Sequence, residues 1–416
     1  MRLANSAFKF HNVIVESVRH QRVRVTMVSS LAESVLQTAA GAAATAPMFE
    51  LGLRKLGPRT CAHYAWHPNL KINFEIDPVA LPHVIGPGTI TTNSIGERGS
   101  SLPATSSEKA FRVLVVGGSA AEGYVIRDEE YWPNVVQRLL SQDCFLANAG
   151  VDTVRVGSIA KSLSPIRVHG PALQKIQHRY KSLDAIVALF GASDLVEWVE
   201  NKCQILPHDQ LGDFRQFFQL NTLPPFGWGM KTSALFKYSR VAHAKLFQSK
   251  VHKAPIGTNL SELRRKRANA RQIIEALPDM SALLVNIKKD MEEFLRIAQG
   301  LAPRVIVLEQ PWFDRSPNAV EEAMMWHFSY GNPRLGSPDA YFAHSAASDG
   351  LRVIADTIAE VTTRSGATWV PVRKSVEPSL SNYYDYLHPT NEGSIKIAQV
   401  CANAFNQACI RSRIAA

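Results

Sequence analysis

The sequence has few cysteines and no hydrophobic run of membrane-spanning length. Only five cysteines occur among its 416 residues, and no two of them form a Cys-x-x-Cys pair. Such sparse and widely spaced thiols argue against both a disulfide framework and a zinc site. No segment approaches the roughly 18 apolar residues that a transmembrane helix needs. These absences indicate a globular protein without disulfides, structural zinc or a membrane anchor.

The N-terminal region carries no clear targeting segment. An Ala-rich stretch over residues 27–48 follows a basic patch, an order that superficially matches a signal peptide. However, Glu33 and Gln37 interrupt the apolar core that a signal peptide requires. We therefore expect a cytoplasmic protein, with an extracytoplasmic or membrane-peripheral location as the alternative.

Acidic residues are outnumbered: 46 Lys and Arg face 36 Asp and Glu, which gives a net charge of +10. Much of this excess lies within residues 231–271, where Glu262 alone opposes a series of basic side chains. A solvated face of a helical insertion is the favoured interpretation, because most charge runs are solvated. Docking of an anionic partner through 231–271 is the alternative. No nucleic-acid-binding motif accompanies the stretch, so no nucleic acid is expected.

The chain divides into two regions by composition. Residues 1–105 predict an irregular N-terminal extension with one Ala-rich helix and short strands, which ends in a Ser-rich linker. Residues 106–412 predict a second domain, with a mostly helical insertion at about 196–280. The sequence predicts no oligomeric state.

Short apolar runs alternate with amphipathic segments in the second region. Five such runs predict strands, and the longer segments between them predict helices. The strand runs are residues 111–116, 145–147, 185–190, 305–308 and 368–372. This alternation predicts an α/β fold, with a five-stranded parallel sheet covered by helices on both faces.

The first chemical signal is Ser119, which follows a predicted strand and the pair Gly117-Gly118. A serine at such a strand–helix junction is exposed, and a neighbouring base can activate its hydroxyl. A dinucleotide fingerprint does not fit, since Ser119 stands where its motif needs glycine. A phosphate-binding loop does not fit either, because no Gly-Lys-Ser/Thr follows. A plain structural turn is the remaining alternative.

The second signal is Asp385 followed three residues later by His388, near the C-terminus. This spacing lets the carboxylate orient one imidazole and stabilise its protonated form, as a catalytic triad requires. An isolated Asp-x-x-His is more often a surface turn. Here Pro389-Thr390 and a Gly-containing helix start follow it, which strengthens the catalytic interpretation.

Two loops between these signals can supply hydrogen-bond donors to an oxyanion. One contains Gly150, after the run 145–147, and the other contains Ser193, after the run 185–190. Asp194 is interpreted as a structural hydrogen-bonding group. Trp326 is interpreted as core packing, with a substrate wall as the alternative.

Together these four blocks, in this order, resemble the SGNH hydrolase family of GDSL-like lipases and acylhydrolases, over about residues 110–408. Residues 92–99 are also similar to the Asn-x-x-Gly-x-Arg-Gly lead-in of some bacterial members. The resemblance implies a flavodoxin-like three-layer α/β/α sandwich.

The resemblance also implies roles for individual residues. Ser119 would be the nucleophile, His388 its base and Asp385 the group that orients the base. Ser119, Gly150 and Ser193 would form the oxyanion hole. Two departures stand out: the first block reads Gly-Gly-Ser rather than Gly-Asp-Ser, and Ser193 replaces the family asparagine.

The expected function is hydrolysis of a carboxylic (acyl or acetyl) ester through an acyl-enzyme, without metal or organic cofactor. The substrate would be a small-molecule, glycan or lipid ester. One alternative is an acyltransferase to a glycan that uses the same residues. Another is a catalytically degenerate binding protein on the same fold, with 231–271 holding an anionic partner.

Overall fold

The computed structural model describes residues 48–52, 64–66, 68–99, 109–180, 182–206 and 256–414, with side chains to residue 407. The chain divides into two compact units, of which one comprises residues 1–4, 65–218 and 255–416. The other comprises residues 5–64 and 219–254. The strands and helices named in the following paragraphs all lie in the first unit.

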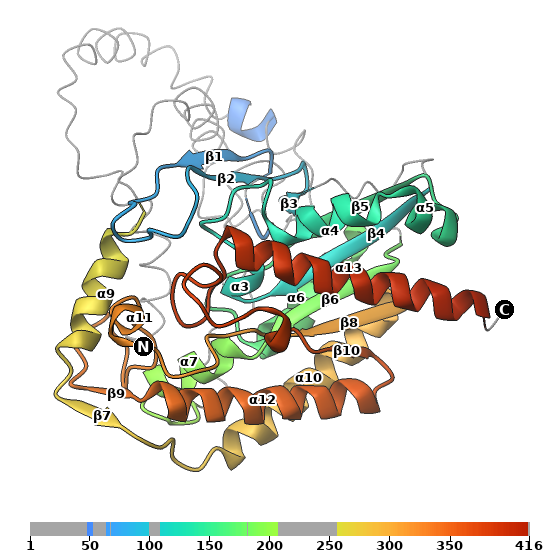
Figure 1. Cartoon of the computed structure of the whole chain (residues 1–416). Coiled ribbons are helices and arrows are strands. Elements are labelled where there is room, and N and C mark those ends of the chain that lie inside the picture. Colours follow the sequence, from blue (N-terminus) through green and yellow to red (C-terminus); the bar gives the residue numbers. More distant parts are fainter. Residues whose placement is uncertain are drawn as a thin grey trace, which may run out of the picture. The chain divides into compact units, whose positions relative to one another are not determined.

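A six-stranded sheet forms the centre of this unit, in the order β10-β8-β6-β4-β5-β3 (Figure 1). Five strands run parallel, and only the edge strand β3 is antiparallel to its neighbour β5. The strands are β3 (Arg98–Gly99), β4 (Ala110–Gly117), β5 (Thr153–Ser158), β6 (Ala185–Phe190), β8 (Arg304–Glu309) and β10 (Thr368–Val370).

The sequence of the central strands explains their position. All six residues of β6 are buried, as are all but Arg112 in β4, so these Val- and Leu-rich strands are covered on both faces. The parallel strands follow the flavodoxin-like order, in which β4 lies between β5 and β6. The chain adds β5 on one side of β4 and all later parallel strands on the other side. Ligands of such sheets bind at the carboxyl ends of the strands beside this switch point.

Two groups of helices pack on the sheet, which lies between them in Figure 1. One group contains α4 (Trp132–Leu140), α5 (Asp143–Ala149) and α13 (Asn391–Ile414). The other contains α6 (Ile166–Ile176), α10 (Ser281–Leu301) and α12 (His344–Arg364), with α7 (Ala192–Glu200) against α12. This arrangement confirms the predicted three-layer α/β/α architecture.

Smaller elements flank the carboxyl edge of the sheet. They include an antiparallel pair, β1 (Lys71–Phe74) with β2 (Gly88–Thr91), and a parallel pair, β7 (Gln272–Ile274) with β9 (Ala340–Phe342). The short helices there are α3 (Ser119–Glu122), α9 (Thr258–Ala268), α11 (Ala319–Glu322) and η4 (Arg373–Ser375), whereas η1 (Gln177–Arg179) follows α6 and precedes β6 at the amino edge. None of the helices in the described ranges combines the length and the apolar character that crossing a bilayer needs.

One predicted strand is wrong. Residues 145–147 lie in helix α5, and the true strand β5 begins only at Thr153. The run was misleading because the side chain of Phe145 is buried edge-on against Phe111 of β4, at 5.3 Å between ring centroids. Helix α5 therefore presents an apolar residue to the sheet without being part of it.

The predicted domain boundary at residue 105 also differs from the structure. Residues 65–99 belong to the same compact unit as the sheet, because β3 pairs with β5 through Arg98 opposite Ser158. This pairing adds the sixth strand. Within the predicted insertion at about 196–280, residues 207–255 lie outside the described residues. Its described parts are the end of α7, then α9 and β7.

Candidate active site

Ser119 lies on a sharp turn at the carboxyl end of β4, where it is the first residue of α3. The two preceding glycines are required by close contacts. At Gly117, φ is 154° and an added Cβ would lie 2.5 Å from the carbonyl oxygen of Leu189 in β6. An added Cβ on Gly118 would lie 2.6 Å from the hydroxyl oxygen of Ser193. At position 117 only glycine permits this approach, and the small residue at 118 leaves room for the Ser193 hydroxyl at the start of α7.

Asp385 and His388 share one tight turn that fixes both side chains. The Oδ1 atom of Asp385 accepts hydrogen bonds from the backbone N–H groups of Leu387 and His388, both at 2.9 Å. The imidazole Nδ1 of His388 lies 2.9 Å from Oδ1 and 2.8 Å from Oδ2 of Asp385. The Tyr384 ring stacks on His388, with 5.4 Å between centroids. The carboxylate therefore orients the imidazole within a segment of four residues.

Folding brings this turn to the predicted serine. The Nε2 atom of His388 lies 2.7 Å from the hydroxyl oxygen of Ser119. The carboxylate of Asp385 is fully buried, the His388 side chain is 13% exposed, and Ser119 is partly exposed. With Nδ1–H donating to Asp385, Nε2 is free to accept the proton of the serine hydroxyl, as nucleophilic catalysis requires.

The indole of Trp326 supports the carboxylate from a distant part of the sequence. Its Nε1–H donates to Oδ2 of Asp385 at 3.0 Å, and the residue is buried. Burial acts to raise the pKa of Asp385, but the adjacent His388 and His327 and the donated hydrogen bonds outweigh burial and hold that pKa below its ordinary value. Asp385 therefore stays ionised. No spacing in the sequence connects residues 326 and 385, so sequence analysis missed this role of Trp326.

His327 lies beside the triad without joining its hydrogen bonds. Its ring stacks on Trp326 at 3.7 Å between centroids and lies 5.3 Å from the ring of His388. Both ring nitrogens are buried and make no hydrogen bond, and burial holds the pKa of His327 well below its ordinary value. His327, Asp385 and His388 offer potential metal-ligand atoms within 4.8 Å of one another. A metal ion bound there would need the same Asp385 and His388 atoms that form the hydrogen bond between these two residues. The geometry therefore favours a catalytic triad over a metal site.

Gly150 does not belong to the site. It is the C-cap of α5, with φ 66°, and its N–H donates to the carbonyl of Leu146. It precedes β5, whereas Ser119 follows the parallel strand β4, so the two residues lie at opposite edges of the sheet. The expectation that Gly150 donates to an oxyanion is therefore wrong. The loop that leaves β5 beside Ser119 is 159–164, where the N–H of Lys161 donates to the carbonyl of Gly117 at 2.9 Å.

Ser193 is next to the nucleophile turn, as the sequence predicted. It is the second residue of α7, and its hydroxyl lies against Gly118. Ser119 is the first residue of α3, and the N–H groups of a first helical turn have no partner within the helix. The Ser193 hydroxyl and the N–H of Ser119 are thus two hydrogen-bond donors at the nucleophile turn.

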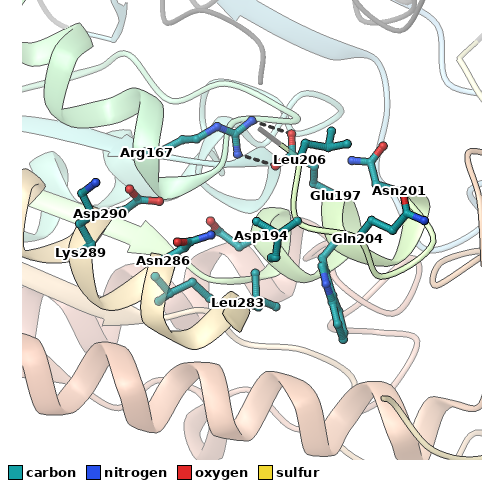
Figure 2. A pocket seen from close by; sticks show the side chains of 13 residues that line it. Arg167, Asp194, Glu197, Asn201, Gln204, Leu206, Leu283, Asn286, Lys289 and Asp290 are labelled. Atoms are coloured by element: carbon teal, nitrogen blue, oxygen red, sulfur yellow. Dashed lines mark hydrogen bonds and ion pairs between the residues drawn. The ribbon is translucent and has the colours of Figure 1, made fainter. Parts of the chain in front are cut away.

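Asp194 lines a cavity of about 220 Å³ between α6, α7 and α10 (Figure 2). Its Oδ1 accepts the N–H of Ile166 at 3.2 Å, while Oδ2 has no partner. Burial raises the pKa of this carboxyl to about 8. In Figure 2 the ion pair of Arg167 with Glu197 closes one side of the cavity. The described lining contains no triad residue, so Asp194 supports the start of α6.

The described part of the basic stretch is largely tied to the protein's own backbone. The buried Arg264 donates to the carbonyls of Met324 and Tyr384, at 3.0 and 3.2 Å. Arg267, also buried, donates to the carbonyl of His327 at 2.9 Å. These two arginines therefore brace segments around the site. Residues 231–255 of the stretch lie outside the described residues.

No protein-family model matches the chain. No curated protein gives a significant match either. Several solved structures are similar. Axe2, an acetylxylan esterase from Geobacillus stearothermophilus, is 10% identical; the match covers 73% of this chain and 95% of Axe2, with a TM-score of 0.36. A lipase/acylhydrolase from Enterococcus faecalis is 11% identical; the match covers 72% of this chain and 97% of that one, with a TM-score of 0.35.

A third similar structure, from Parabacteroides merdae, is named as a GDSL-like lipase and is 9% identical. Its match covers 73% of this chain and 99% of that one, with a TM-score of 0.36. The structural neighbours are thus SGNH- or GDSL-like esterases and lipases. At such identities and TM-scores this likeness says nothing of catalysis in this chain, whose fold is given by its own strand order.

Proposed function

We propose that this chain hydrolyses carboxylic esters as a serine esterase, with Ser119 as nucleophile, His388 as general base and Asp385 as the group that orients the base. The observation that carries this proposal is the unbroken series of hydrogen bonds from Asp385 through His388 to Ser119. A degenerate fold would have no reason to keep the bond from His388 to Ser119, which joins residues 269 positions apart.

The reaction follows from this geometry. The imidazole Nε2 takes the hydroxyl proton as Ser119 Oγ attacks the ester carbonyl, and the ionised Asp385 stabilises the resulting imidazolium. The protonated His388 then gives its proton to the departing alcohol, which leaves an acyl group on Ser119. Water, activated by the same imidazole, releases the carboxylic acid and restores the serine.

The negative charge on the carbonyl oxygen is held by the N–H of Ser119 and the hydroxyl of Ser193. Both donors are present before the substrate binds, so they stabilise the transition state without reorganisation. Gly150 has no part in this oxyanion hole. The substrate class that we propose is a small-molecule, glycan or lipid ester.

Replacement of the nucleophile tests the proposal. We expect the purified wild-type chain to hydrolyse short p-nitrophenyl esters and to gain one fluorophosphonate adduct on Ser119 in intact-mass analysis. We expect Ser119→Ala to lose about 10⁴-fold or more in kcat and all labelling, because removal of a triad nucleophile typically has that effect. Ser316→Ala, a change at an exposed serine, is the matched control. Wild-type activity in Ser119→Ala would disprove the proposal.

A further inference from the structure

The lead-in motif at residues 92–99 has no part in the reaction just described, yet it contains the most deeply buried arginine of the region. Arg98 is 1% exposed and lies on β3, opposite Ser158 of β5. Burying a guanidinium is unfavourable unless its hydrogen-bond donors and its charge are satisfied. The hydrogen-bond partners of the Arg98 guanidinium therefore indicate the role of this residue.

Each nitrogen of the guanidinium has a partner. Nη1 donates to the carbonyls of Glu122 and Gly123 at 2.8 and 3.0 Å. Nη2 donates to the carbonyls of Thr89 and Ile126 at 2.8 and 2.7 Å.

Charge and ring contacts complete the environment of Arg98. Its Nε donates to Asp128 at 3.1 Å, which supplies the countercharge. The guanidinium carbon also lies 3.7 Å from the centroid of the Tyr131 ring. Four of the donated bonds thus go to backbone carbonyls, and two of these carbonyls lie at the end of α3.

Helix α3 needs this support because it is a single turn of four residues. A helix this short cannot hold itself by its own hydrogen bonds. Its terminal carbonyls are satisfied from outside: the hydroxyl of Tyr131 donates to Ala121 at 2.9 Å, and Arg98 donates to Glu122 and Gly123. A positive charge at a helix C-terminus is also favourable to the helix dipole.

The rest of the motif holds Arg98 in place. Asn93 Oδ1 accepts the N–H groups of Ile95 and Glu97, both at 3.0 Å, which closes the turn before β3. Gly99 has φ 106°, and an added Cβ would lie 2.7 Å from the carbonyl oxygen of Val156. A side chain at position 99 would therefore push β3, and Arg98 with it, away from β5.

We propose that Arg98 is a positioning residue for the nucleophile. It clamps the carboxyl end of the one-turn helix whose first residue is Ser119, and so keeps the hydroxyl in register with the imidazole of His388. This inference rests on the proposed function. Lysine can replace Arg98 only in part, because an ammonium offers three donors from one point, whereas the planar fork of arginine reaches partners on two sides.

The test compares Arg98→Lys and Arg98→Gln with the wild type at a temperature where circular dichroism shows all three folded. We expect kcat and the rate constant of fluorophosphonate labelling to fall about 100-fold in Arg98→Gln, since a displacement of about 1 Å at a reacting atom has effects of that size. We expect KM to change less than threefold. Arg98→Lys should recover part of the labelling rate, because it keeps the charge at the end of α3.

Arg373→Lys is the matched control. Arg373 bridges Glu309, at 3.1 Å, and Asp314, and it contacts no part of α3. We expect it to lower the melting temperature while labelling stays within about twofold of the wild type. Labelling of Arg98→Gln within twofold of the wild type, or a loss equal to that of Arg373→Lys at an equal drop in melting temperature, would overturn the role of Arg98.

Amide hydrogen exchange separates this inference from the proposed function. The N–H groups of Ala121, Glu122 and Gly123 donate within the turn that begins at Gly118. We expect Arg98→Gln to speed exchange in a peptide that covers residues 118–123, with little change in β6. If the wild type neither hydrolyses esters nor takes the label, the esterase proposal fails alone. Unchanged exchange in Arg98→Gln would mean that Arg98 does not hold α3.

Discussion

The two halves of the candidate triad are held by opposite means. The Asp385–His388 half is largely self-supporting, because Asp385 accepts both backbone N–H groups of the turn that carries the imidazole. The Ser119 half is a single helical turn that depends on Arg98 and Tyr131, which lie outside it. A motif whose supporting contacts lie within a few residues can be recognised from the sequence. For a motif that distant residues support, the sequence reveals the reactive residue but not the residues that hold it.

The largest expected effect comes from breaking the self-supporting half. We expect Asp385→Asn to lower kcat about 10⁴-fold, since an amide neither stabilises the imidazolium nor selects the correct tautomer. The measurement is kcat on a p-nitrophenyl ester between pH 4 and 9. Because the pKa of Asp385 is held below its ordinary value, the wild-type profile should show no inflection from this carboxyl above about pH 4.

The same shift has a consequence for stability. A carboxyl with a lowered pKa stabilises the folded state above its unfolded pKa of about 3.9, and this contribution is lost as the pH falls further. We therefore expect the stability gap between the wild type and Asp385→Asn in urea unfolding to narrow below pH 4. An Asp385→Asn variant with kcat within tenfold of the wild type would contradict the role of Asp385 in orienting His388.

A smaller effect is expected in the other half from Ser193→Ala. The hydroxyl of Ser193 lies against Gly118, and loss of one oxyanion donor typically lowers kcat about 100- to 1000-fold. We expect a fall near the lower end of this range, with KM nearly unchanged, in steady-state assays. Ser281→Ala, on an exposed serine at the start of α10, is the control. An unchanged kcat would show that Ser193 does not contact the oxyanion.

The smallest expected effect comes from Trp326→Phe, which removes the donor from outside the Asp385 turn. The carboxylate keeps its backbone and imidazole partners, so we expect kcat to fall only about tenfold, in line with a hydrogen bond to a charged group of about 1.5 kcal/mol. Steady-state kinetics and thermal melting together measure this. A loss as large as that of Asp385→Asn would mean that the turn does not support itself.

Most of the fold was predictable from the sequence, because buried parallel strands are continuous apolar runs. The run 185–190 matches β6 residue for residue, and 111–116 lies within β4. The run 145–147 failed because three apolar residues fit a helix that packs on the sheet as well as a strand. Strand β3 was missed because two residues, one of them a buried arginine, carry no strand pattern.

The site was predictable where chemistry and local spacing coincide. Ser119, Asp385 and His388 meet as expected, and Ser193 lies beside them. Gly150 was misplaced because the apolar run before it, 145–147, predicts a strand, whereas that run lies in α5 and Gly150 precedes β5. Arg98 and Trp326 could not be found from spacing, since the carbonyl of Glu122 lies 24 residues from Arg98 and the carboxylate of Asp385 lies 59 residues from Trp326.

The bond between Ser119 and His388 joins positions 269 residues apart, and α13, which packs on α4 and α5, follows the imidazole almost directly. Closing a loop of that length opposes folding by about 5 kcal/mol of chain entropy. Reactivity thus requires that these two distant segments have met. During refolding, we expect a fluorophosphonate to capture the serine only after this contact has formed.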